Sequence, residues 1–108
     1  MPEVQGVITA ANTMTNPHVI TVTWNNAAFT NGASSYRVIY RISGTSSWTT
    51  EVIQGGSVTT YDIEDIEHAK IYELYVVPVG SDGKDIRKTA VLNKDTLAGP
   101  LQLIRLII

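Results

Sequence analysis

The segment Ile66–Val79, with the sequence IEHAKIYELYVVPV, decides which fold the rest of the chain can adopt. It passes from a polar corner into an apolar run in which Tyr72, Leu74 and Val76 occupy every second position. Alternation with this period is typical of a half-buried β-strand, because successive side chains point to opposite faces. The segment therefore predicts a central strand with Tyr72 where the strand begins, and the remaining chain must supply strands that pack against it.

Six further segments have the composition of short strands separated by turns rich in Gly, Asn and Ser. The clearest alternation lies in His18–Trp24 (HVITVTW) and Tyr36–Ile42 (YRVIYRI). The predicted strands are Val4–Ala11, His18–Trp24, Tyr36–Ile42, Trp48–Gln54, Val58–Ile63, Lys70–Val79 and Asp85–Leu92. With no helical periodicity between them, they predict an all-β, seven-stranded antiparallel β-sandwich.

Three motifs, in the order in which they occur, resemble a fibronectin type III domain over roughly Pro2 to Leu92. They are a Trp that ends the second strand, a Y-x-V-x-Y third strand, and an aliphatic residue six places before a corner Tyr. The resemblance implies a structural core that contains Trp24, Tyr36, Val38, Tyr40, Ile66, Tyr72, Leu74 and Val76. It also implies that the Tyr72 hydroxyl bonds to the backbone of the corner. Pro78 departs from the pattern, and its missing amide hydrogen predicts an unpaired or bulged strand there.

Length and charge limit the classes of protein to which the chain can belong. It has 108 residues and no cysteine, which predicts one domain held by packing and excludes a disulfide scaffold. The formal net charge of -2 provides no basic surface for nucleic acid or an anionic membrane. The first residues lack a basic region followed by an apolar one, so we expect a protein made in the cytosol without a signal peptide.

No residue pattern indicates catalysis, a metal site or a cofactor. Neither His18 nor His68 is tied to a serine or cysteine by a triad or elbow motif, so we predict that the chain is not an enzyme. Without EF-hand spacing, acids in a corner are interpreted as solvated side chains. The one dense cluster of possible metal ligands is Asp62, Glu64, Asp65, Glu67 and His68.

Two further features are candidates for binding sites. The loop Gly80–Lys84 (GSDGK) has neither P-loop spacing nor the Arg-Gly-Asp of some adhesive relatives of the resembled family, so it is predicted to be a hairpin turn. Ile39 and Tyr75 fall on the outward faces of their strands and are candidates for a contact patch.

The C-terminal segment is not explained by the sandwich. We predict a domain over residues 1–92 and, over 93–108, a linker followed by an extra apolar strand or extended tail. Apolar side chains on both faces of a strand require cover on two sides, because the exposed segment would aggregate. The segment either packs on its own sandwich or adds as a strand to another subunit, and we favour the second. Its apolar residues are Leu101, Leu103, Ile104, Leu106, Ile107 and Ile108.

The sequence as a whole predicts a non-catalytic structural or interaction module of a larger assembly. The favoured setting is a virion, as an accessory or decoration subunit of a bacteriophage head or tail, located at the virion or extracellular surface. Its expected partners are other protein subunits, including a second copy of itself. Glycan is a further candidate ligand. One alternative is a spacer or glycan-binding module of a secreted bacterial enzyme, and a second is a cell-surface adhesion module. A further alternative is that the chain is a piece of a longer protein.

Overall fold

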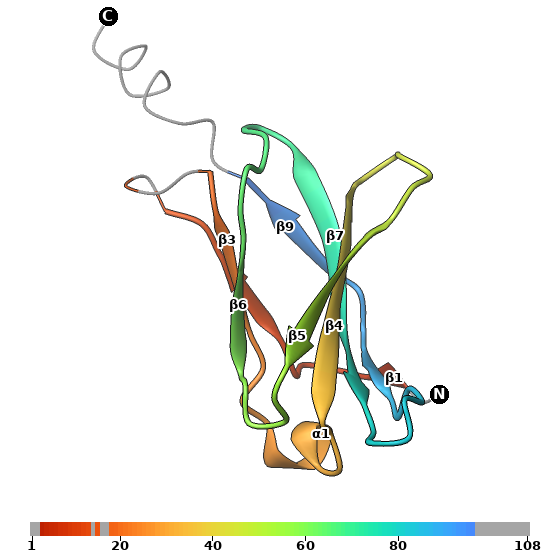
Figure 1. Cartoon of the computed structure of the whole chain (residues 1–108). Coiled ribbons are helices and arrows are strands. Elements are labelled where there is room, and N and C mark those ends of the chain that lie inside the picture. The colour runs from red at the N-terminus through yellow and green to blue at the C-terminus, as the bar shows by residue number, and fades with distance from the viewer. Residues whose placement is uncertain (1–2, 14, 16–17, 97–108) are drawn as a thin grey trace, which may run out of the picture.

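Two facing β-sheets and one short helix are formed by residues 3–13, 15 and 18–96, which are the residues described by this computed structural model (Figure 1). The elements are β1 (Glu3–Val4), β2 (Thr9–Ala11), β3 (Ile20–Thr23), α1 (Ala27–Thr30), β4 (Ser35–Ile42), β5 (Thr49–Gln54), β6 (Thr60–Ile63), β7 (Ile71–Val79), β8 (Lys88–Thr89) and β9 (Leu92–Asp95).

The sandwich has a four-stranded sheet in the order β5-β4-β7-β9 and a three-stranded sheet in the order β2-β3-β6. Both sheets are antiparallel, and the register of β4 on β7 places Val38 opposite Val76. The pair β1 and β8 is parallel and forms a separate two-stranded sheet. The predicted antiparallel β-sandwich is confirmed, with this small parallel pair as an addition.

The core lies between the inward faces of the two sheets. Trp24 and Tyr36 pack with their ring centroids 5.4 Å apart, and the Tyr36 hydroxyl donates to the carbonyl of Gly56 at 2.7 Å. Tyr40 is half-buried at the edge of the core cluster. The other residues that the resemblance places in the core are buried: Trp24, Tyr36, Val38, Ile66, Tyr72, Leu74 and Val76.

The last strand differs from its prediction. Instead of one strand over Asp85–Leu92, β8 pairs with β1, and β9 pairs with β7 as far as Asp95 opposite Ile71. Residues 93–95, assigned from sequence to a linker, therefore belong to the four-stranded sheet, and the end placed at Leu92 is wrong. The residues that pair with β8 and β9 are distant in sequence. The local sequence pattern therefore could not show where the pairing with β7 begins again after β8.

Pro78 accounts for part of that difference. Strand β7 runs through Pro78 without the predicted bulge, and Pro78 pairs with Tyr36 of β4. Its carbonyl accepts from Ile86 N at 3.0 Å, so its nitrogen, which has no hydrogen, also faces the Ile86 side. On that side the described pairing is limited to an isolated bridge between Val79 and Asp85 before β9 begins. The predicted loss of pairing is thus restricted to one edge of the strand.

A single-turn helix, α1, lies in the segment predicted to be a loop. Asn26 caps it by accepting from Phe29 N at 3.0 Å, and Phe29 is buried in the hydrophobic core. Arg87 donates to the carbonyls of Phe29 and Asn31 at the end of the helix, which supplies partners for carbonyls that a helix leaves unpaired. The prediction missed this helix because four residues are too few to show a 3.6-residue period.

The polar corner before β7 is closed by Tyr72. Its hydroxyl accepts from Glu67 N at 2.9 Å, while its ring is only 5% exposed. The hydrogen bond implied by the resemblance is therefore present. The next backbone link, from Ile66 N to the His18 carbonyl at 3.0 Å, ties the corner to the strand that enters β3.

Thr96, the last described residue, is buried against the same corner. Its backbone N donates to the Lys70 carbonyl at 2.8 Å, and its Oγ1 accepts from Lys70 N at 2.9 Å. The same Oγ1 lies 3.0 Å from the Glu67 carbonyl and 2.8 Å from the Lys70 carbonyl, so its proton has an acceptor. These contacts hold the end of the described chain against the corner.

Candidate functional site

The two histidines lie together, which the sequence did not predict. The rings of His18 and His68 are 4.4 Å apart at an interplanar angle of 62°. They come from the segment before β3 and from the corner before β7, so only the fold joins them. Within residues 3–13, 15 and 18–96, no group of three or more His, Cys, Asp or Glu side chains is placed to hold a metal ion.

The apolar tail residues predicted to bind a partner lie outside the described residues. They are Leu101, Leu103, Ile104, Leu106, Ile107 and Ile108. What the structure adds is the position of Thr96, which closes the tyrosine corner at the end of β9.

The outer face of the four-stranded sheet carries a partly exposed pair of aromatic rings, Trp48 and Tyr75, with Arg41 and Lys88 beside them. The guanidinium of Arg41 lies 4.1 Å from the ring centroid of Trp48, and its Nε donates to Glu73 at 2.7 Å. Tyr75 meets the Trp48 ring edge to face at 5.4 Å, and Lys88 Nζ lies 5.6 Å from the Tyr75 ring. Contacts of this kind hold Trp48 in one orientation although its side chain is partly in solvent.

Of the two residues predicted for a contact patch, the structure favours Tyr75 over Ile39. Ile39 is 7% exposed, so the expectation that it contributes to a surface patch is wrong. Its partners in the two neighbouring strands are Thr50 of β5 and Tyr75 of β7. Exposed apolar side chains on this face are instead Val52, which is 60% exposed, and Ile71, which is 47% exposed and lies on the same face of β7 as Tyr75.

The loop Gly80–Lys84 is a self-contained hairpin turn. Gly80 N donates to the Lys84 carbonyl at 2.9 Å, and Gly83 N donates to the Gly80 carbonyl at 2.9 Å. Lys84 N is bound by Asp82 Oδ1 at 3.1 Å. These amides are used inside the turn, so they are not directed at an anion, and the prediction of a hairpin turn is confirmed.

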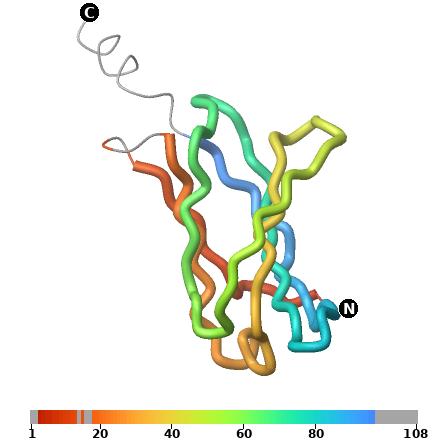
Figure 2. Tube along the Cα trace, viewed as in Figure 1, coloured from red at the N-terminus to blue at the C-terminus, as the bar shows by residue number. Residues whose placement is uncertain are grey.

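A groove of about 660 Å³ opens where β5 and β6 flank the sandwich. Each of these strands is the outermost strand of its described sheet. Figure 2 shows that the two strands diverge from the turn that joins them. Three tyrosines from three strands line the groove: Tyr40 of β4, Tyr61 of β6 and Tyr72 of β7.

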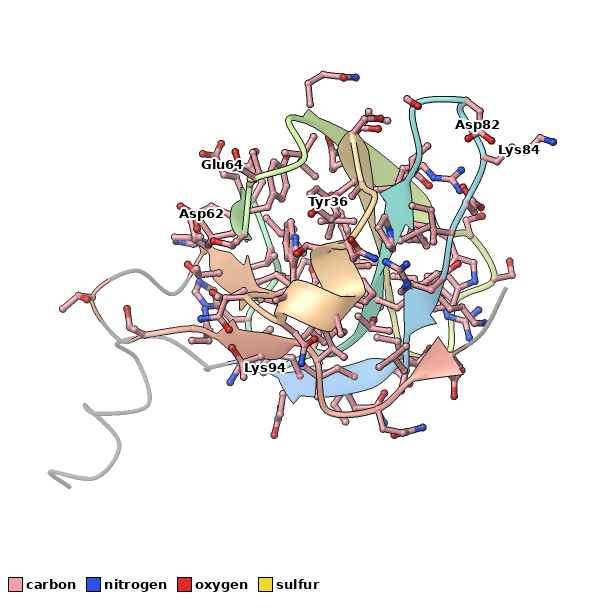
Figure 3. All side chains as sticks on the ribbon, turned by 90° about the horizontal axis from the view of Figure 1, so that it is seen from below. Tyr36, Asp62, Glu64, Asp82, Lys84 and Lys94 are labelled. Atoms are coloured by element: carbon pink, nitrogen blue, oxygen red, sulfur yellow. The ribbon has the colours of Figure 1, made fainter. Side chains whose placement is uncertain are left out.

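Four carboxylates also line this groove, which we call the tyrosine groove. Glu51 stands on β5, while Asp62, Glu64 and Asp65 stand on β6 and the corner that follows. Figure 3 shows Asp62 and Glu64 on the same flank of the molecule. The Asp62 carboxylate accepts from the Thr21 hydroxyl at 2.8 Å. The sequence pointed to the acidic corner but not to Glu51 or to the tyrosines, because two sheets must meet before these side chains become neighbours.

The environment of the groove raises the pKa of two tyrosines above their ordinary value of 10.0. For Tyr61 the main cause is burial, followed by the negative charge of Glu51 and its hydrogen bond to that carboxylate, and then by Glu64. For Tyr40 the causes are burial and then the charge of Glu51. Both hydroxyls are therefore protonated at neutral pH and present neutral rings and O–H donors to the groove.

Solved structures with a similar fold come from more than one protein. One described as a myokine superposes with a TM-score of 0.71 at 10% sequence identity, over 90% of this chain and 99% of that chain. A crystal structure of a fibronectin type III domain of human collagen XX gives 0.67 at 14% identity, over 89% and 98%. A solution structure of a fibronectin type III domain of the human collagen alpha-1(XX) chain gives 0.68 at 15% identity, over 86% and 80%.

These likenesses establish the fold. No protein-family model matches the chain, and no curated protein sequence matches it. The fold hosts many functions, so the site has to supply the functional argument. Among the described residues, no helix is long and apolar enough to cross a membrane.

Proposed function

We propose that this chain, which has the fibronectin type III fold, is a non-catalytic interaction module of a larger protein assembly and docks through its C-terminal apolar segment. The observation that carries the proposal is the end of the sandwich. Strand β9 completes the four-stranded sheet at Asp95, and Thr96 closes the tyrosine corner. The apolar residues of segment 101–108 follow a domain in which each described strand already has at least one pairing partner.

A segment with apolar side chains on both faces gains most by entering another protein. An added strand would satisfy its backbone through main-chain hydrogen bonds, and pockets in the partner would take its side chains. The outer face of the four-stranded sheet supports an interaction role, because Trp, Tyr and Arg are the residue types most enriched at binding hot spots. Here Trp48, Tyr75 and Arg41 lie together on that face.

The favoured assembly is the virion expected from the sequence, with the segment docked on a neighbouring subunit. The same docking mode serves a partner subunit of another assembly or a second copy of this chain. This setting stays a prediction, as do the surface location and the alternatives of a glycan-binding spacer and an adhesion module.

The proposal is tested by shortening the chain after Pro100. Light scattering after size-exclusion chromatography would report oligomeric state, and thermal denaturation would report stability. A docking strand predicts loss of assembly with an unchanged melting temperature. A matched full-length variant, Leu103→Gln with Ile107→Gln, is expected to lose assembly as well, which separates chain length from apolar character.

Two outcomes would contradict the proposal. A chain that is monomeric before and after shortening, with a melting temperature lowered by more than about 5 °C, would show that the segment packs on its own sandwich. A chain whose assembly survives both changes would show that the interface lies elsewhere.

A further inference from the structure

We propose that the tyrosine groove binds an arginine side chain carried on an extended segment of a partner protein. This inference goes beyond the docking of the C-terminal segment and does not depend on it. It rests on the position of the groove, the chemistry of its walls and the charge around it.

The position favours an extended ligand. The groove opens between β5 and β6, and each of these strands has one hydrogen-bonded neighbour among the described strands. Edge strands leave backbone N–H and C=O groups available to a further strand. A segment lying along this flank would therefore find main-chain partners as well as side-chain contacts.

The walls favour a planar cation. Tyr40 and Tyr61 are half-buried and protonated at neutral pH, and the buried Tyr72 also lines the groove. A guanidinium stacks on aromatic faces and is more weakly hydrated than an ammonium group, so it loses less on entering such a groove. The Tyr72 oxygen accepts from Glu67 N, and the Tyr61 hydroxyl is hydrogen-bonded to Glu51, so the Tyr61 and Glu51 groups are already oriented toward each other in the groove.

The charge around the groove is unbalanced. Glu51, Asp62, Glu64 and Asp65 line it, and they are four of the ten acidic residues of the chain. No Lys, Arg or His of the described chain lines it. The ion pairs found among the described residues involve acids outside the groove: Asp85, Glu73 and Glu3. A basic ligand would supply the missing positive charge and would be steered to this flank.

Glu51 also has a simpler interpretation. It stands opposite Val38 on an edge strand, where an inward-pointing charge discourages aggregation through that edge. That role needs no ligand and no tyrosines. The two interpretations differ in one respect: only a binding groove makes the affinity for an arginine peptide depend on Glu51.

The test is a titration of the full chain with the peptide acetyl-Thr-Arg-Thr-Arg-Thr-amide, followed by amide chemical shifts in NMR spectra. We expect shifts confined to β5, β6, the corner at 64–67 and the part of β4 around Tyr40. We also expect an affinity that falls as NaCl rises from about 50 to about 500 mM. The same peptide with Gln in place of Arg is expected to bind at least about tenfold more weakly.

Variants assign the contacts. Glu51→Gln and Glu64→Gln are each expected to weaken binding about threefold to fivefold, and Tyr61→Leu by a similar factor, whereas Tyr61→Phe keeps the ring and most of the affinity. The matched control is Asp82→Asn, which removes an exposed acid on the distant hairpin (Figure 3) and is expected to leave binding unchanged. Amide spectra of each variant would verify that it is folded.

Three results would overturn the inference. They are equal affinity for the Arg and Gln peptides, shifts centred away from the groove, and equal binding by the Glu51→Gln and Asp82→Asn proteins. Equal binding by these two variants would show that Glu51 does not bind the peptide and only discourages aggregation at the β5 edge.

Discussion

Replacing Tyr72 by Phe separates the two roles of the corner tyrosine. The substitution keeps the ring, which is 5% exposed, and removes the oxygen that accepts from Glu67 N at 2.9 Å. A hydrogen bond of this kind contributes about 0.5–1.5 kcal/mol net. Glu67 is exposed, so water can partly replace the lost acceptor, and we expect the free energy of unfolding to fall by about 1 kcal/mol.

Replacing Tyr72 by Ala removes the ring as well. Truncation of a buried aromatic costs about 3–5 kcal/mol, since the lost burial and the cavity add together. The difference between the Ala and Phe variants therefore measures the ring, and the difference between the Phe variant and the unaltered protein measures the hydroxyl. For a domain of this size, the Phe variant is expected to melt about 4–8 °C lower.

The assay is equilibrium unfolding in urea, followed by tryptophan fluorescence, since Trp24 is fully buried in the native state. Tyr75→Phe is the matched control, because the Tyr75 hydroxyl makes no hydrogen bond within the described residues. It should change stability by less than about 0.5 kcal/mol. The reasoning is refuted if Tyr72→Phe is as stable as the control, or if it is as unstable as Tyr72→Ala.

Three further substitutions test backbone and hydrogen-bond features. A Cβ at Gly56 would lie 2.0 Å from the Ala33 carbonyl oxygen, so Gly56→Ala should cost about 1–3 kcal/mol in urea unfolding, and an unchanged midpoint would contradict this contact. Ala69 has a φ of 56°, so Ala69→Gly should stabilise by about 0.5–1 kcal/mol in the same assay, whereas a loss would argue against a left-handed corner. Thr96→Val removes the acceptor for Lys70 N and should cost about 1–3 kcal/mol in thermal unfolding, unless that amide finds another partner.

Alternation in the sequence predicted the central strands because it records which side chains are buried together. Ile20 and Val22 alternate with threonines, and the structure buries both of them completely. The pairing of strands that are distant in sequence produces no comparable local pattern. The parallel contact of β1 with β8, and the continuation of β9 to Asp95, depend on which distant backbone groups meet.

The tyrosine groove was beyond sequence analysis for a related reason. Glu51 and Tyr61 belong to strands of different sheets, and each looks like an ordinary strand residue in its own segment. The corner acids were visible as a cluster, but their relation to Tyr40 needs the two sheets to be packed. The same limit applies to His18 and His68, which the fold brings together.

The placement of β1 and β9 has a mechanical consequence. In Figure 1, β1 lies toward the end of the sandwich that carries α1, whereas β9 ends toward the opposite end. Tension applied through Glu3 and Thr96 would pull along the strands. Hydrogen bonds between strands run across the strand direction, so the bonds of β9 with β7 would be sheared together and not opened one after another. A pulling force applied between these two ends would therefore load the hydrogen bonds between β7 and β9 in shear.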